Sequence, residues 1–284
     1  MIADWEATGV FLADTLHVRQ PDLFAFIQST LGSHGVEVRV LHHVRDIWAR
    51  DFCPIQVRPG QLVQFRYEPD YLAEHAELRS DRAVARQFAE VGEIQHSDIN
   101  LDGGNVVASR SKAIITDKVY RENSGWNRAK LREELRQLLQ VEQLVVIPKE
   151  PYDPIGHADA MVRFIDEGTV WLNDYSKVAP TFGDRLAKTL HRHGLKIKLA
   201  PYFLERQTTN GIPSAVGCFT NLLRTEKVVL VPVYGRKQDR IARERLHALI
   251  PDVPIVSVDC TNLARQGGVL NCVCASYRCF PKGA

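Results

Sequence analysis

Short apolar runs alternate with polar turns along most of the chain, and these runs are rich in β-branched residues. Two such runs on either side of one tight turn predict a β-hairpin. Four hairpins are expected, with turns at Pro59-Gly60, Ser111, Glu167-Gly168 and Thr225, and the strand after the Ser111 turn is expected over residues 113–119. Because the turns recur roughly every 50 to 60 residues, the chain has the period of a repeat structure.

A helical stretch follows each hairpin. The clearest lies between residues 131 and 139, where four leucines occupy one helix face. A lone strand at 9–13 has no hairpin before it, and a final apolar run at 269–277 has no helix after it, so the two ends together complete a fifth unit. The pattern predicts five like units, stacked or in a ring; an α+β fold with accidental spacing is the alternative. The other predicted helices cover residues 22–31, 82–91, 184–193 and 238–250.

The composition is that of an ordinary globular protein, with 284 residues, of which 45% are hydrophobic and 25% charged. We expect one catalytic domain over residues 1–284. A formal net charge of +2 predicts neither a nucleic-acid nor a membrane partner. No apolar run approaches ~18 residues and no export signal begins the chain, so we expect a cytoplasmic protein with reduced cysteines. Self-association is left open.

Carboxylates recur at matching places before the turns. Asp51 lies nine residues before Gly60, Asp102 nine before Ser111, and Asp159 eight before Glu167. Cys272 takes the corresponding place before the last strand, and His157 stands beside Asp159. Residues at one position of each unit in a ring converge on its axis. Several buried carboxylates do not help to pack a core, because each is costly to bury without a cation. This set of residues therefore predicts a functional site.

Each member also has a plainer interpretation. In that interpretation Asp51 pairs with its neighbour Arg50 or caps a turn. Asp102, which precedes two glycines, would be a turn residue. His157 is a satisfied histidine near a strand, and Cys272 is a small buried hydrophobe. The cysteines at 272, 274 and 279 also permit a weak zinc interpretation, although they lack a paired CxxC.

The chain resembles the agmatine deiminases and the bacterial Porphyromonas-type peptidylarginine deiminases of the guanidino-group-modifying (pentein) superfamily. The resemblance spans residues 48–272, most of the chain, in family order. It implies a single-domain α/β fold, a five-bladed pseudo-symmetric α/β propeller of ββαβ repeats. It also implies a hydrolase that acts on a guanidino compound without a metal or cofactor. The segments that carry it are IWARDFCP, LDGGNV, GHADAMVRF, GCFTNLL with VVLVPVYG, and GGVLNC.

The resemblance assigns roles position by position. Cys272 is similar to the family nucleophile, and His157 to its general acid and base. Asp51 and Asp159 are similar to the pair that holds the guanidinium, and Trp48 and Asn271 fall in matching segments at the substrate. The chain departs from the family in three places: Asp102 replaces a longer glutamate beside the histidine, Asn271 replaces a histidine, and Gln266 stands in a shortened glycine run.

The chemistry suits these residue types. A guanidinium is planar and strongly basic, and its edges match carboxylates bidentately. Its carbon is a poor electrophile, which calls for a thiolate nucleophile. The three carboxylates are expected to raise the pKa of the Cys272 thiol, and a bound guanidinium to offset them. The sequence therefore predicts release of ammonia from a guanidinium, with agmatine as the expected substrate, and a thiol that substrate binding activates.

Several other functions remain open at this point. An arginine or peptidyl-arginine deiminase or an amidinotransferase would use the same centre, and Arg163 and Arg224 are candidates to bind a substrate carboxylate. A cysteine protease would use Cys272, His157 and one aspartate but leaves the other carboxylates unexplained. A non-catalytic guanidinium-binding module is the third alternative.

Overall fold

Five three-stranded sheets make up most of the molecule, which a computed structural model describes over residues 1–209 and 211–279. In every one of the five, the central strand pairs antiparallel with one neighbour and parallel with the other. The parallel partner needs a crossover, and a helical segment supplies it in each unit. The fold is therefore of the α/β class.

Four of these sheets follow one another along the chain, and their strands bracket the four predicted turns. In each, the first two strands form the hairpin and the third returns parallel to the second. They are β3 (Ile55–Arg58), β4 (Gly60–Arg66) and β5 (Gly92–Asn100); β6 (Val107–Ala108), β7 (Lys112–Thr116) and β8 (Gln143–Ile147); β9 (Val162–Phe164), β10 (Thr169–Asn173) and β11 (Lys196–Ala200); and β14 (Leu223–Arg224), β15 (Val229–Val233) and β16 (Ile255–Asp259).

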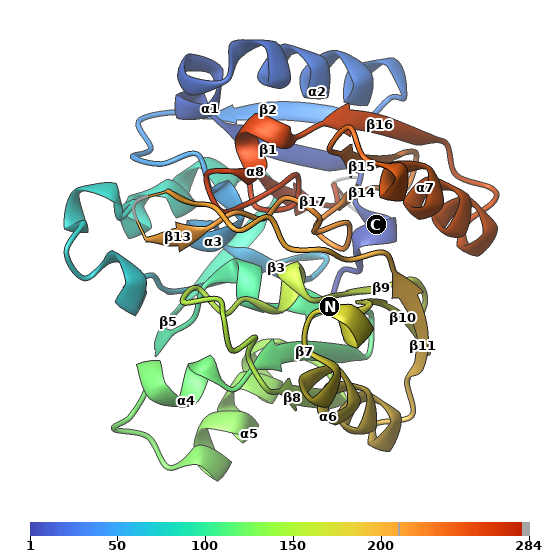
Figure 1. Ribbon diagram of the computed structural model, residues 1–284. Coiled ribbons are helices and arrows are strands. Elements are labelled where there is room, and N and C mark those ends of the chain that lie inside the picture. Colours follow the sequence, from blue (N-terminus) through green and yellow to red (C-terminus); the bar gives the residue numbers. More distant parts are fainter. Residues whose placement is uncertain (210, 280–284) are drawn as a thin grey trace.

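The remaining three-stranded sheet joins the two ends of the described chain. Its order is β17 (Cys274–Tyr277), β1 (Gly9–Ala13) and β2 (Glu37–Leu41), with β1 antiparallel to β17 and parallel to β2 (Figure 1). The predicted union of the first strand with the final apolar run is thus confirmed. A small extra hairpin, β12 (Thr208–Thr209) and β13 (Ile212–Pro213), stands apart from the five units.

The long helices lie on the outside of the sheets, where α2, α5, α6 and α7 form the periphery of Figure 1. Each buries one apolar stripe; that of α5 contains Leu131, Leu135 and Leu138. Pro21 and Pro180 each open a helix at a position where the missing N–H costs nothing. The helices are α1 (Asp14–Arg19), α2 (Pro21–Ser33), α3 (Ala49–Phe52), α4 (Lys118–Glu122), α5 (Arg128–Leu138), α6 (Pro180–Arg192), α7 (Lys237–Leu249) and α8 (Thr261–Ala264).

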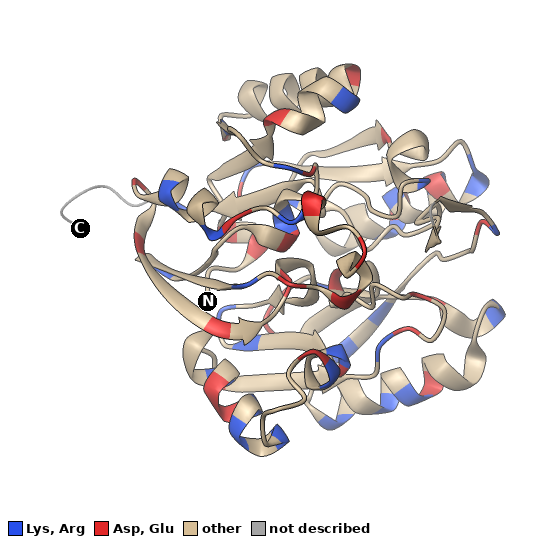
Figure 2. Ribbon diagram, turned by 90° about the vertical axis from the view of Figure 1, so that its left-hand side faces the viewer, with Lys and Arg blue, Asp and Glu red and all other residues tan. Residues whose placement is uncertain are grey.

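Short 3₁₀ segments occur in several of the connections between strands and ahead of β1. They are η1 (Asp4–Glu6), η2 (Asp70–Leu72), η3 (Ala76–Leu78), η4 (Arg82–Phe88), η5 (Gly103–Asn105), η6 (Ala158–Ala160) and η7 (Tyr175–Lys177). None of the helices within residues 1–209 and 211–279 combines the length and apolarity needed to reach across a bilayer. Basic and acidic residues are interspersed over the ribbon (Figure 2).

Two predicted elements were wrong in detail. The α-helix expected over 82–91 is the 3₁₀ segment η4, and it ends at Phe88 because β5 must begin at Gly92. There the backbone lies so close to Gly60 that a Cβ would fall 2.3 Å from its carbonyl carbon. The strand expected to run through residue 119 stops at Thr116, where the N–H of Asp117 donates to the carbonyl of Ile147 and the chain turns into α4.

The apolar stripe of α5 generates a stability prediction. Leu135 is fully buried, so Leu135→Ala leaves a cavity and should lower the free energy of unfolding by about 2–5 kcal/mol. Leu204→Ala is the control, because the Leu204 side chain is 42% exposed and its truncation should cost less than about 1 kcal/mol. Denaturant unfolding followed by circular dichroism measures both, and equal losses would contradict the assigned packing.

Candidate active site

The loops that open the units meet in the middle of the molecule. The short helix η5 packs against both α3 and η6, and α3 also contacts β17. Asp51 lies in α3, Asp102 immediately before η5, and Asp159 in η6. Each stands just ahead of a first hairpin strand, as the repeat predicts. The convergence expected from the sequence spacing is therefore present in the fold.

A cavity of about 430 Å³ opens at this meeting point. The sequence-predicted residues Asp51, His157, Asp159 and Cys272 line it, whereas Asp102 lies behind the imidazole and is fully buried. The same wall includes Trp48, also a predicted site residue. Further parts of the lining come from the segments around η2 and η3, from the β12–β13 hairpin, from the loop at residues 266–268, and from Arg19, Asp46, Asp153 and Ile155.

His157 is held between two carboxylates. Its Nε2 lies 2.7 Å from Asp102 Oδ2, and its Nδ1 lies 3.5 Å from Asp51 Oδ1. Asp102 therefore reaches the imidazole although it is one methylene shorter than the glutamate of the family pattern. The Asp102 contact fixes the ring orientation and leaves Nδ1 on the side of Asp51.

Burial and charge shift the pKa of these groups in opposite directions. Burial would lower the pKa of His157, but Asp51 and Asp102 outweigh it and raise the pKa to about 9. Burial raises the pKa of Asp51 to about 7, with Asp102 and Asp159 adding to the effect and His157 opposing it. Without a ligand near neutral pH, the imidazole is thus protonated and Asp51 is only partly ionised.

The Cys272 sulfur has acidic and amide neighbours. It lies 3.9 Å from Asp159 Oδ2 and 3.2 Å from the side-chain nitrogen of Asn221. Burial raises the pKa of the Cys272 thiol well above its ordinary value, and Asp159 and Asp51 raise it further. The expected upward shift is confirmed, and burial is its larger cause.

Asn221 was missed by the sequence analysis. Its side-chain oxygen accepts the backbone N–H groups of Asn271 and Cys272, so it holds the loop that carries the sulfur. The segment GCFTNLL was cited for its resemblance, and an asparagine just before a strand was the available signal. The predicted residue Asn271 lies close by, and its side-chain nitrogen donates to Asp159 Oδ2 over 2.6 Å.

The two glycines after Asp102 permit close approach of the loops and are not explained by a turn alone. A Cβ on Gly103 would lie 2.0 Å from the Arg50 carbonyl oxygen. A Cβ on Gly104 would lie 2.5 Å from Asp51 Oδ1 and 2.6 Å from His157 Nδ1. The Gly104 N–H also donates to Asp51 Oδ1 over 3.2 Å. Only a residue without a side chain fits between these groups.

Three arginines considered from the sequence serve other ends. Arg50 donates to the Ser276 hydroxyl and not to Asp51. Arg163 pairs with Asp4 over 2.6 Å and donates to the carbonyl of Leu222. Arg224 donates to the carbonyl of Ile165 and lies over the Trp5 ring. Neither Arg163 nor Arg224 lines the cavity, so both are structural and the suggestion that they bind a substrate carboxylate was wrong.

The zinc interpretation also fails. Cys274 is buried in β17, while the exposed Cys279 thiol donates to Glu37 on a different strand. Within residues 1–209 and 211–279, no group of three or more histidine, cysteine or acidic side chains is arranged to hold a metal ion.

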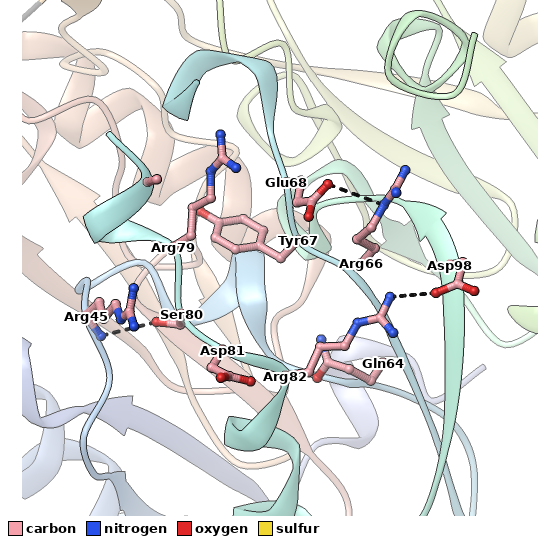
Figure 3. Close-up of a pocket in the computed structure, with 11 residues that line it drawn as sticks. Arg45, Gln64, Arg66, Tyr67, Glu68, Arg79, Ser80, Asp81, Arg82 and Asp98 are labelled. Carbon is pink, nitrogen blue, oxygen red and sulfur yellow. Dashed lines mark hydrogen bonds and ion pairs between the residues drawn. The ribbon is translucent and has the colours of Figure 1, made fainter. Parts of the chain in front are cut away.

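A second hollow lies next to the cavity, and Tyr67 borders both (Figure 3). Its walls are polar and rich in arginine, and two of the arginines are paired: Arg82 lies 3.1 Å from Asp98 and Arg66 lies 3.7 Å from Glu68. Its lining, within the described residues, contains no thiol and no imidazole. The Cys272 thiol and the His157 imidazole therefore line the first cavity and not this hollow.

The α/β fold described above is shared with solved structures of C. jejuni agmatine deiminase and of a Pseudomonas aeruginosa DDAH. The chain belongs to the Porphyromonas-type peptidyl-arginine deiminase family, whose model matches residues 10–277.

Individual relatives agree with this assignment. A Mycoplasma capricolum protein that carries the provisional name agmatine deiminase is 23% identical over 68% of this chain, and the match covers 62% of that relative's length. Among solved structures, substrate-bound C. jejuni agmatine deiminase, a cysteine-to-serine variant, matches 97% of this chain and 95% of its own, with 20% identity and a TM-score of 0.78. The agmatine deiminase of Enterococcus faecalis matches 98% of this chain and 95% of its own, with 18% identity and a TM-score of 0.80.

The tight fit around Gly104 generates a prediction that does not depend on any activity. In Gly104→Ala the new methyl group must displace Asp51 or His157, so we expect a loss of about 1–3 kcal/mol in the free energy of unfolding. Gly125→Ala is the matched control, because a Cβ there meets open space. Denaturant unfolding of both variants tests this, and a Gly104→Ala protein as stable as the control would disprove the close approach.

Proposed function

We propose that this chain is a cysteine-dependent deiminase that hydrolyses the guanidinium group of agmatine to a ureido group, giving N-carbamoylputrescine and ammonia. The observation that carries the proposal is the single cavity bordered by Cys272, His157, Asp51 and Asp159. A cavity with paired acids, an imidazole and a thiol suits a flat cation whose carbon must be attacked.

The roles follow from the positions. Asp51 and Asp159 each accept hydrogen bonds from the guanidinium, which holds its plane fixed and its carbon near the Cys272 sulfur. Trp48 and Asn271 shape the binding site: Trp48 packs against Gly268, and Asn271 keeps Asp159 in place through its hydrogen bond. Asp102 is the positioning carboxylate of the His157 ring, because it makes the shortest contact with it.

The first half-reaction removes ammonia. The Cys272 thiolate adds to the guanidinium carbon, and a C–S bond forms as one C–N π bond breaks. His157, which is protonated near neutral pH because its pKa is raised to about 9, gives its proton to the departing nitrogen. The C–N bond then breaks, ammonia leaves, and a covalent amidino-thioether remains on Cys272.

The second half-reaction restores the thiol. His157, now neutral, takes a proton from water, and the resulting hydroxide adds to the thioether carbon. The C–S bond breaks, the sulfur leaves as thiolate, and the new hydroxyl loses its proton to solvent as the carbon becomes a ureido carbonyl. One imidazole serves as acid and then as base, which balances protons over the two steps.

Substrate binding is the event that activates the sulfur. In the empty cavity, burial and the two clamp carboxylates keep Cys272 protonated. A guanidinium between Asp51 and Asp159 neutralises the charges that disfavour the thiolate and adds a cation beside it. The nucleophile is therefore formed when its target is in place.

The rim of the cavity favours a substrate with a cationic tail. Beyond the clamp, three further carboxylates line it: Asp46, Glu77 and Asp153. Among the described lining residues Arg19 is the one arginine, and it is already paired with Asp46 over 3.1 Å. This surplus of acid suits the ammonium of agmatine better than the carboxylate of arginine. The agmatine deiminases among the similar structures support the same choice.

Several wider features belong to the same proposal. The five three-stranded sheets are the blades of a pseudo-symmetric propeller, and the whole forms one catalytic domain. The cavity lies at its centre, beside the short helices α3, η5 and η6. The six cysteines are free thiols, which favours work in the reducing cytoplasm.

The nucleophile can be tested directly. Cys272→Ala should lower ammonia release from agmatine by at least about 1,000-fold, because no other group in the cavity replaces the thiolate. Cys218→Ala is the control, since Cys218 is buried but lies outside the cavity lining. Coupled ammonia detection with agmatine, arginine and short arginyl peptides measures turnover and ranks the substrates. Undiminished turnover by Cys272→Ala would overturn the mechanism.

A pH prediction follows from Asp51, whose pKa in the empty cavity is about 7. The bound guanidinium favours the ionised carboxylate, so the pKa falls on binding and affinity rises as pH increases through 7. We expect agmatine to bind Cys272→Ala about tenfold more tightly at pH 8 than at pH 6, measured by titration calorimetry. Asp51→Asn in the same background should lose most of this rise, whereas the exposed Asp184→Asn should keep it. An identical pH dependence in all three proteins would exclude Asp51 from the clamp.

A further inference from the structure

One lysine is buried beside the acid–base pair. Lys118 is the first residue of α4, just after β7, and its side chain has no exposed surface. Its Nζ lies 2.7 Å from Asp102 Oδ2 and 2.8 Å from Glu122 Oε1. The sequence analysis placed this residue in a strand and gave it no role. Lysine is rarely buried completely unless it is paired.

The contacts of Lys118 and His157 meet on one atom. Asp102 Oδ2 is 2.7 Å from Lys118 Nζ and 2.7 Å from His157 Nε2, while the other carboxylate oxygen, Oδ1, has no hydrogen-bond partner in the described part of the chain. A lysine that served only to neutralise Asp102 could have used the free oxygen. Instead both cations share one oxygen, so the ammonium lies close to the imidazole and acts on its charge.

Lys118 also contacts a residue that lines the cavity, Tyr71 of η2. Its Nζ lies 4.9 Å from the centre of the Tyr71 ring, which in turn meets the His157 ring edge to face at 5.9 Å. Glu122, the second partner of Lys118, accepts the backbone N–H of Asp70 over 3.2 Å. The lysine therefore links the segment η2 to the acid–base pair.

We propose that Lys118 is a positioning residue for the acid–base pair: it holds Asp102 against His157 and, through its charge, makes the imidazolium easier to deprotonate. This inference rests on the proposed function, in which His157 must give up a proton and later take one from water. The assignments of the substrate, the clamp and the nucleophile do not depend on this inference, although the Lys118 charge also lowers the pKa of Asp51.

The surrounding charges explain why such a residue is needed. The groups that face the imidazole are Asp51 from α3, Asp102 ahead of η5, Lys118 from α4 and the Tyr71 ring from η2. The two carboxylates favour the imidazolium strongly, and Lys118 is the cation that opposes them. Without it, His157 would hold its proton too tightly to act as a base at neutral pH.

Lys118 acts on Asp102 in the complementary sense. Burial would raise the pKa of Asp102, but Lys118 and the hydrogen bond from His157 outweigh it and lower the pKa to about 2. The carboxylate consequently stays ionised and keeps accepting from the ring throughout turnover. Asp102 and Glu122 hold the pKa of Lys118 itself at about 12, so the lysine remains a cation.

The decisive measurement is the titration of His157 in the protein without substrate. Protein labelled with ¹⁵N-histidine is followed by long-range ¹H–¹⁵N correlation, and the His157 signal is assigned by its loss in His157→Gln. Lys118→Met should raise the His157 midpoint by about one pH unit or more, a tenfold or greater gain in proton affinity. Lys118→Arg, which keeps the charge, should stay near the wild-type midpoint, and the exposed Lys130→Met should match it.

Turnover provides a second measurement. In Lys118→Met the acidic limb of the kcat profile should move to higher pH by a similar amount, with kcat at pH 7 falling about tenfold and KM changing less than threefold. Lys118→Arg should recover most of the lost kcat. A uniform fall in kcat at every pH, with an unshifted profile, would reduce Lys118 to a structural role and overturn the proposal.

Two further outcomes can be told apart from failure of the inference: a variant that does not fold, and failure of the proposed function. If Lys118→Met does not fold, the double variant Lys118→Met with Glu122→Gln removes one buried charge of each sign, and the His157 midpoint should still rise. A folded variant with the wild-type midpoint would refute the inference. If the wild type released no ammonia from any guanidino compound, the proposed function would fail, whereas the His157 titration would still decide whether Lys118 acts on the pair.

Discussion

The balance of buried charge at the centre of the molecule is the constraint on which the rest of the structure depends. Three aspartates, at 51, 102 and 159, are almost fully buried there, each on a different unit of the fold. Buried carboxylates are tolerated only when cations and hydrogen-bond donors compensate them. His157 and Lys118 supply part of that compensation, and the remaining deficit of positive charge is the basis of the proposal that the cavity binds a cation.

That deficit links stability to binding. Without a ligand, burial raises the pKa of both Asp51 and Cys272. Asp51 is therefore protonated part of the time near neutral pH, and Cys272 stays a thiol. A bound guanidinium opposes both shifts at once. The groups whose pKa values are shifted most without a ligand are therefore those that take part in the proposed reaction. Strongly shifted pKa values commonly occur at active sites.

Much of the fold was predictable because its signals are local. The hairpin turns and the leucines of α5 follow from short-range rules, and equal spacing then indicated the repeat. The convergence of Asp51, Asp102, His157, Asp159 and Cys272 followed from position within each unit. The resemblance to a known family, in turn, supplied the roles that spacing alone leaves open.

Other features depend on tertiary contacts and have no local signature. Lys118 has the sequence context of an ordinary lysine after a strand, and only the packing of α4 under Tyr71 buries it. Asn221 lies in the segment GCFTNLL, but nothing in that segment shows that its side-chain oxygen accepts two backbone N–H groups. The donors belong to Asn271 and Cys272, about 50 residues further along the chain. From the sequence, Gly104 is simply a turn residue. Its second role depends on Asp51 and His157, which come from two other units and lie against it in the fold.

The pairing of β17 with β1 has a consequence for how the site matures. The carboxylates and the imidazole come from units whose strands are near neighbours in sequence, so they can assemble locally. Cys272 sits beside a strand that must find its partner at the opposite end of the chain, and such distant closure is slow because it sacrifices the most chain entropy. Under the proposed function, the carboxylates and the imidazole are therefore in place before the sulfur joins them, because β17 must first pair with β1.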